Sequence, residues 1–211
     1  MNLKLPRIYP ITDARLSGLS HAEQVEKLIA GGAKIIQLRE KHASPRDFYA
    51  SAAKAVLIAK ENGVKIIIND RVDIALALKA DGVHLGQDDM PPEEARLILG
   101  ERAIMGLSTH TVEQVRTASV LPLDYIAIGP IFPTRTKENP DAVVGLAGLV
   151  KIREIIPGMP IAAIGGINEE NLLFVLDAGA DAVAVIGAIV SDGAKIEETM
   201  RKFINLSANK Y

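Results

Sequence analysis

The sequence predicts an α/β fold, a single TIM (β/α)8 barrel that takes up residues 1–211 as one domain. Short aliphatic runs alternate with longer amphipathic stretches, and the alternation repeats eight times along the chain. Hydrophobic residues make up 48% of the chain and aromatic residues only 4%. That composition suits parallel strands that are buried on both faces. The length of 211 residues is close to the lower size of a closed eight-stranded barrel.

The aliphatic runs are the predicted strands, since each is bounded by Gly, Pro, Asp, Asn or Ser. In chain order they are 7–11, 34–38, 65–68, 82–85, 103–107, 125–128, 160–164 and 182–186. Between them apolar residues recur three and four apart, as in Val25, Leu28 and Ile29, which predicts helices. An open doubly wound sheet is the main alternative, but that fold would usually need fewer strand–helix cycles.

The predicted helices carry start and stop signals. N-cap residues and terminal glycines fall where the periodic stretches begin and end. The N-caps are Ser20, Ser44 and Thr111, and the glycines are Gly31, Gly63 and Gly179. One helix-to-strand turn, made of Ala and Gly and in two copies also Asp, recurs at 31–33, 80–82 and 178–181. These signals agree with a repeated strand–helix unit.

Composition also limits the function. The chain has no cysteine, which excludes disulfides, zinc–thiolate sites and a cysteine nucleophile. The formal net charge of -2 gives no reason to expect nucleic acid or membrane partners, which favour a basic face. The longest apolar runs are far shorter than the roughly 20 residues that span a bilayer. The first residues show no secretory signal, so we expect a cytoplasmic protein.

Polar residues follow the predicted strands, where barrel enzymes carry their active sites. Gln37, Arg39 and Lys41 alternate at the end of the second run, so their side chains share one face. The two cations would bind phosphate or diphosphate there. A solvated charge cluster at a strand end is the alternative.

Two carboxylates follow the next strands. Asp70 comes after the third run and Asp89 after the fourth. Acids at the mouths of adjacent strands suit Mg²⁺, which prefers oxygen ligands and often bridges to phosphate. Capping of the following helices is the alternative, because Asp is a favoured N-cap. We favour the metal, because the acids lie beside the predicted basic cluster.

The remaining strand ends are also polar or rich in glycine. Ser108 could donate to phosphate, whereas His110 could either act in catalysis or only order its loop. The long segment 129–137 combines hydroxyls with cations and predicts a functional loop rather than a plain solvent loop. Gly166 and Gly187 follow the seventh and eighth runs, where barrels often bind phosphate through backbone N–H groups.

Taken together, these motifs resemble the thiamine-phosphate synthase family along essentially the whole chain. The resemblance is carried by segments 9–13, 37–41, 69–70, 86–89, 108–111, 129–137, 165–167 and 186–187. It implies the joining of a hydroxymethylpyrimidine diphosphate to a thiazole phosphate, or to its carboxylated form, with release of pyrophosphate. In this family the pyrimidine–oxygen bond is thought to break first.

The resemblance also assigns roles to residues of this chain. The implied catalytic residues are Arg39, Lys41, Ser108 and Lys137, and the implied Mg²⁺ ligands are Asp70 and Asp89. The implied substrate-binding residues are Gln37, Leu38, Arg39, Glu40, Lys41, Asn69, Ser108, Thr134, Arg135, Thr136, Lys137, Gly166, Ile186 and Gly187. Many family members have Ser where this chain has Gly187, so a hydroxyl contact to the thiazole phosphate is lost while a backbone contact remains.

Three other functions stay open at this point. A related thiazole tautomerase shares the fold and the region around His110 but generally lacks the full diphosphate set. A phosphosugar isomerase or epimerase would need only the phosphate loops. A non-catalytic barrel that binds a thiamine precursor is the third. In each case the expected partners are small-molecule substrates, and both a monomer and a homo-oligomer are compatible with the sequence.

Overall fold

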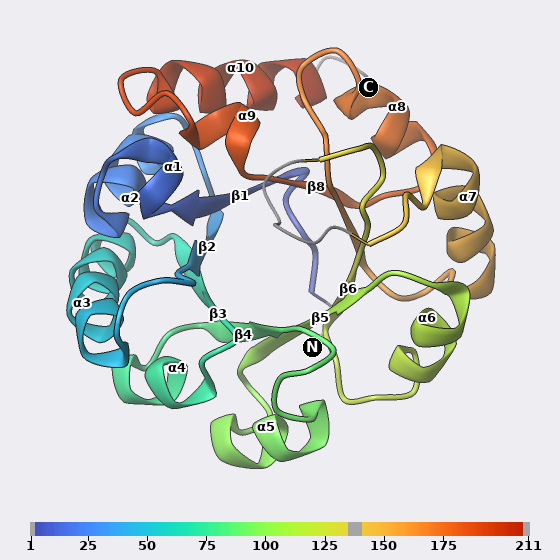
Figure 1. Ribbon diagram of the computed structural model, residues 1–211, viewed down its shortest axis with the longest axis horizontal. Helices are drawn as coiled ribbons and strands as arrows, with labels where there is room; N and C mark the ends of the chain where they lie inside the picture. The colour runs from blue at the N-terminus through green and yellow to red at the C-terminus, as the bar shows by residue number, and fades with distance from the viewer. Residues whose placement is uncertain (1–2, 135–140, 209–211) are drawn as a thin grey trace.

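The computed structural model describes residues 3–134 and 141–208 and contains one closed barrel of parallel strands. In Figure 1 the strands form the inner ring and the helices lie outside it. The strands are β1 (Ile8–Asp13), β2 (Ile35–Arg39), β3 (Lys65–Asn69), β4 (Gly82–Leu85), β5 (Ile104–Thr109), β6 (Tyr125–Ile128), β7 (Ile161–Ile164) and β8 (Ala182–Val185). They pair in chain order, and β8 closes on β1, so the barrel prediction is confirmed.

The helices follow the predicted alternation. They are α1 (Ala14–Ser17), α2 (His21–Ala30), α3 (Pro45–Glu61), α4 (Val72–Leu78), α5 (Pro92–Leu99), α6 (Val112–Ala118), α7 (Gly145–Ile155), α8 (Leu172–Asp177), α9 (Gly187–Val190) and α10 (Ile196–Ala208). None of the helices within residues 3–134 and 141–208 is long and apolar enough to cross a membrane.

The barrel has two cores because alternate strand residues face opposite ways. One core fills the barrel interior and includes Tyr9, Ile67 and Tyr125. The other lies between the strands and the helices and includes Leu38 and Phe203. Strands buried on both faces explain the continuous aliphatic runs.

The predicted helix boundaries are found in the structure. Ser20 caps α2 in a capping box with Glu23, since each side chain accepts a hydrogen bond from the other residue's backbone N–H. Ser44 caps α3 and Thr111 caps α6, each through its side-chain oxygen. Gly31 ends α2.

One pattern of hydrogen bonds recurs at three places, within the residues that the structure describes, at the amino-terminal ends of the strands, opposite the mouth. We call each instance a closed-end joint. An aspartate just before a strand donates its backbone N–H to a residue on the preceding strand and accepts that residue's N–H through Oδ2. The side-chain bonds join Asp81 to Ile66 (2.8 Å), Asp124 to Met105 (2.9 Å) and Asp181 to Ile161 (2.8 Å). Arg96 pairs with Asp124 and Arg153 with Asp181. These closed-end joints give a physical reason for the repeated Asp-containing turn.

Candidate active site

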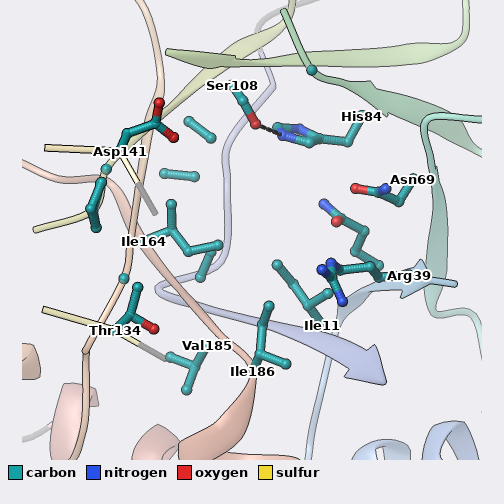
Figure 2. Close-up of a pocket in the computed structure, with 18 of the residues that line it drawn as sticks. Ile11, Arg39, Asn69, His84, Ser108, Thr134, Asp141, Ile164, Val185 and Ile186 are labelled. Atoms are coloured by element: carbon teal, nitrogen blue, oxygen red, sulfur yellow. Dashed lines mark hydrogen bonds between the residues drawn. The ribbon is translucent and has the colours of Figure 1, made fainter. Parts of the chain in front are cut away.

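A cavity of about 650 Å³ opens at the carboxyl ends of the strands (Figure 2). It receives side chains or backbone from all eight strands. Most of the predicted site residues line it together: Gln37, Arg39, Lys41, Asn69, Asp70, Asp89, Ser108, Thr134, Gly166, Ile186 and Gly187. Polar residues that follow separate strands therefore lie together at one mouth.

Some predicted residues lie elsewhere. Leu38 is buried in the core between strands and helices, and Glu40 faces His21, so neither side chain lines the cavity. The two-residue period of a strand accounts for this, because residues 38 and 40 alternate with the three residues that face the mouth. Arg135, Thr136 and Lys137 lie outside the described residues.

Each described cation of the predicted basic cluster is held by a carboxylate. Arg39 donates to Asp13 over 2.7 Å, and Lys41 Nζ donates to Asp70 Oδ2 over 2.5 Å. Both pairs lie at the edge of the mouth and are partly exposed to solvent. Their main effect is therefore to fix the direction of two long side chains rather than to add much stability.

Asn69, the last residue of β3, presents an unsatisfied donor beside these pairs. The residue is only 8% exposed. Its Nδ2 has no hydrogen-bond partner within the described parts of the chain. A buried amide without a partner costs free energy. A bound ligand with an acceptor atom would remove that cost.

The helix-capping alternative is wrong for both predicted metal ligands. The N-cap of α4 is Arg71 and that of α5 is Pro91, and neither helix start has a side-chain cap. Asp70 instead occupies a left-handed turn with φ of 63°, a conformation uncommon for residues other than glycine. Asp89 Oδ2 accepts the backbone N–H of Gly86 over 2.6 Å. Both carboxylates thus belong to the mouth rather than to a helix start.

Asp70 and Asp89 interact with each other. Burial raises the pKa of Asp89, and the charge of Asp70 and a hydrogen bond with it raise that pKa further, against the N–H of Gly86 and the charge of Lys41. Two facing carboxylates, with the pKa of Asp89 raised, fit a divalent cation, which would relieve their repulsion. Residues 3–134 and 141–208 hold no group of three or more His, Asp or Glu side chains spaced for a metal ion. Further ligands would have to come from water or phosphate oxygens.

Below the mouth, a chain of hydrogen bonds crosses the barrel interior, and sequence reasoning missed it. Gln37 Nε2 donates to the Tyr9 hydroxyl (3.2 Å), which lies 3.0 Å from the Tyr125 hydroxyl. The Tyr125 hydroxyl lies 2.9 Å from His84 Nδ1, and His84 Nε2 lies 2.9 Å from Ser108 Oγ. We call these five residues the interior chain.

The interior chain has a direction. Gln37 Nε2 can only donate; in the assignment that continues its direction, Tyr9 donates to Tyr125 and Tyr125 donates to His84 Nδ1. His84 then carries its proton on Nε2 and donates to Ser108, a tautomer assigned from the network. Burial lowers the pKa of His84 to about 4, so the ring is neutral near pH 7. The Ser108 hydroxyl proton remains available to a ligand oxygen.

The opposite wall of the mouth carries Thr134 and Asp141, across from Arg39 and Asn69 in Figure 2. His110 connects to this wall. Its Nδ1 donates to the Gly129 carbonyl over 2.6 Å, and its Nε2 lies 3.4 Å from Asp141 Oδ2. Both ring nitrogens are engaged by the segment after β6, which favours the loop-ordering role for His110 over direct chemistry.

Glycines bring the backbone close to the mouth after β7. Gly165 and Gly166 have φ of 103° and 64°, and a Cβ on Gly166 would lie 2.6 Å from the Pro133 carbonyl oxygen. Gly187 is the first residue of α9 and also lines the cavity. Backbone N–H groups can therefore approach a small anion here without obstruction by side chains.

The fold and the mouth define a TIM-barrel enzyme whose active site lies at the carboxyl ends of the strands. A family model described as thiamine monophosphate synthase matches residues 8–189. The thiamine-phosphate synthase of Chloroflexus aurantiacus is 44% identical over 207 residues, covering 97% of this chain and 95% of that protein. The corresponding protein of Clostridium novyi is 48% identical over 187 residues, covering 88% of this chain and 91% of its own.

A solved structure agrees with these relatives. The thiamine phosphate pyrophosphorylase from Pyrococcus furiosus superposes with a TM-score of 0.86 at 36% identity, covering 96% of this chain and 95% of that one. The chain therefore belongs to the thiamine monophosphate synthase family, and it is a transferase of that family.

Proposed function

We propose that this chain joins hydroxymethylpyrimidine diphosphate to thiazole phosphate and releases thiamine phosphate and pyrophosphate; with the carboxylated form of the thiazole, CO2 is released as well. The observation that carries the proposal is the arrangement of charge on one wall of the mouth. There Arg39 and Lys41 lie beside the facing carboxylates of Asp70 and Asp89. A diphosphate with a divalent cation is the ligand whose charges complement both pairs.

In this proposal the diphosphate half of the mouth combines donors and metal ligands. Arg39, Lys41 and Ser108 would donate to the phosphate oxygens, and Asn69 would place its unsatisfied amide there. Mg²⁺ held by Asp70 and Asp89 would supply positive charge to the leaving group. Lys137, outside the described residues, is proposed for the same half. Gln37 would meet the pyrimidine, whereas Leu38 and Glu40 could meet a substrate only through their backbone.

The other half of the mouth would bind the second substrate. Gly166, Ile186 and Gly187 would hold the thiazole phosphate, largely by backbone N–H groups. Thr134 would meet the thiazole, as would Arg135 and Thr136 outside the described residues. The two substrates would then face each other across the cavity.

The proposed chemistry needs charge stabilisation more than proton transfer. The carbon–oxygen bond of the pyrimidine diphosphate breaks, and pyrophosphate leaves with the electron pair. The thiazole nitrogen then gives its lone pair to the pyrimidine carbon. Positioned cations stabilise the charge that grows on the leaving oxygen, the kind of effect that often dominates catalysis. The proton of the Ser108 hydroxyl, directed by His84, would serve the same purpose.

One incubation tests the proposal: both substrates with Mg²⁺, followed by detection of thiamine phosphate. We expect the product, and we expect none in excess chelator. Isomerisation of the thiazole precursor without condensation would favour the tautomerase, which shares the fold and the region around His110. Substrate binding without any product would favour the binding-only barrel. The cytoplasmic location and the oligomeric state stay predictions.

A further inference from the structure

Glu40 lies behind the active site rather than in it. It directly follows β2, where Arg39 and Lys41 face the mouth. The Glu40 side chain is 13% exposed and points toward His21, the first residue of α2. A carboxylate that is largely removed from water and faces away from the cavity needs another reason to be there.

The Glu40 carboxylate organises the turn that contains Lys41. Its Oε1 accepts the backbone N–H of His42 over 2.8 Å and that of Ala43 over 3.1 Å. Burial alone would raise the pKa of Glu40, but these two hydrogen bonds and the nearby His21 outweigh it and lower that pKa. The group is therefore ionised near pH 7 and holds both ends of the turn.

A buried histidine holds the other oxygen. His21 is 1% exposed, and its Nε2 lies 3.5 Å from Glu40 Oε2, with no hydrogen-bond partner inside the described regions. Its Nδ1 lies 2.7 Å from the Thr12 hydroxyl. Burial lowers the pKa of His21, although Glu40 and Asp13 raise it. A neutral ring with its proton on Nε2 turns that proton toward the Glu40 carboxylate, and its Nδ1 then shares the Thr12 hydroxyl proton with the Gln37 carbonyl, which lies 3.3 Å from the Thr12 oxygen.

We propose that Glu40 is a positioning residue, which shapes the turn at 40–43 so that Lys41 reaches the mouth and meets the diphosphate. His21 lies behind Glu40, and Thr12 in turn contacts His21. The inference rests on the proposed function for the identity of the ligand. It differs from a substrate contact in one respect: the effect of Glu40 should pass entirely through Lys41.

A double-mutant cycle tests whether the effect of Glu40 passes through Lys41. Glu40→Ala, Lys41→Ala and the double variant are titrated with inorganic pyrophosphate and Mg²⁺ by calorimetry, and kinetics are measured with both substrates. We expect Glu40→Ala to weaken pyrophosphate binding about tenfold, and to raise KM for the pyrimidine diphosphate, since one charged contact is misplaced. KM for the thiazole phosphate should change less than about twofold. In the Lys41→Ala background, Glu40→Ala should have no further effect.

Conservative variants separate positioning from loss of folding. Gln in place of Glu40 still accepts from His42 and Ala43. Its amide can donate to His21 Nε2 once the ring moves its proton to Nδ1 and donates to Thr12. Glu40→Gln should therefore stay within about threefold of the wild-type affinity. Should Glu40→Ala not fold, Glu40→Asp replaces it in the cycle, because the shorter side chain keeps the charge but cannot span both contacts.

Several outcomes would overturn the proposal. Additive losses in the cycle would mean that Glu40 acts on the ligand directly. A loss as large in Glu40→Gln as in Glu40→Ala would mean that the charge itself is needed. Equal losses from Glu61→Ala, an exposed control at the end of α3, would show a non-specific effect. A wild-type chain that binds Mg²⁺–pyrophosphate but makes no thiamine phosphate would refute the proposed function and leave the role of Glu40 standing.

Discussion

Acid should destabilise this protein through His84, and the size of the effect follows from its burial. An unfolded histidine titrates near the ordinary pKa of 6.5, whereas burial lowers the pKa of His84 in the fold to about 4. Between these pH values the unfolded chain binds one more proton than the folded chain. The stability that depends on a neutral His84 is therefore complete above about pH 6.5 and is lost as the pH falls toward 4.

The difference of about 2.5 between the two pKa values corresponds to roughly 3 kcal/mol, at about 1.4 kcal/mol for each pH unit. Protonation would also put a hydrogen on Nδ1, so that the Tyr125 hydroxyl could no longer donate to it. We expect urea denaturation of wild type and of His84→Asn, followed by circular dichroism, to give free energies of unfolding that converge by about 3 kcal/mol between pH 7 and pH 4. His42→Asn, on an exposed loop, controls for loss of an imidazole.

A constant difference between wild type and His84→Asn across that pH range would refute the reasoning. It would mean either that the interior chain accommodates the imidazolium or that water enters the barrel. Burial also lowers the pKa of His21. Its contribution cancels in the comparison because both proteins carry it.

Three further predictions concern other parts of the barrel. Asp181→Asn should lower the free energy of unfolding by about 1 kcal/mol, because it removes the charge that pairs with Arg153 at a solvent-exposed joint. The kcat should not change, and an unchanged urea midpoint would contradict this prediction. Asp89→Asn should weaken Mg²⁺ binding and lower kcat by about 100-fold or more if Asp89 is a metal ligand, with calorimetric Mg²⁺ titration and steady-state rates as measurements; wild-type Mg²⁺ affinity would exclude it as a ligand. Gly106→Ala should cost about 3 kcal/mol or more, since its Cβ would lie 2.1 Å from the Tyr125 ring; a thermal midpoint like that of wild type would show that the ring can shift.

The sequence sufficed to predict the barrel and one wall of the mouth. The strand period of two places Gln37, Arg39 and Lys41 on one face, and they do line the cavity together. Parallel strands bring their carboxyl ends to one edge, and this is why Asp70 and Asp89 meet although they are far apart in the chain. Both results need only local periodicity and the rule that parallel strands end together.

The interior chain could not be predicted in the same way. Tyr125 reaches His84 because residue 106, its neighbour in the register of β5 and β6, has no side chain. That depends on which residues pair across strands, which the sequence of one strand does not contain. A histidine within the run 82–85 was the available signal, since an ionisable residue in an aliphatic strand needs a buried partner. The resemblance implies a substrate-binding role for Glu40 because its motif spans 37–41, although the strand period turns the Glu40 side chain away from the mouth.

The closed-end joints group strands of this barrel into pairs. Each joint fastens a strand to the one before it, β4 to β3, β6 to β5 and β8 to β7, by both backbone and side-chain bonds. A pair of neighbouring strands, rather than a single strand, is thus the smallest segment that contains a complete closed-end joint. Duplication or rearrangement of such a chain would preserve these joints only if both strands of a pair moved together.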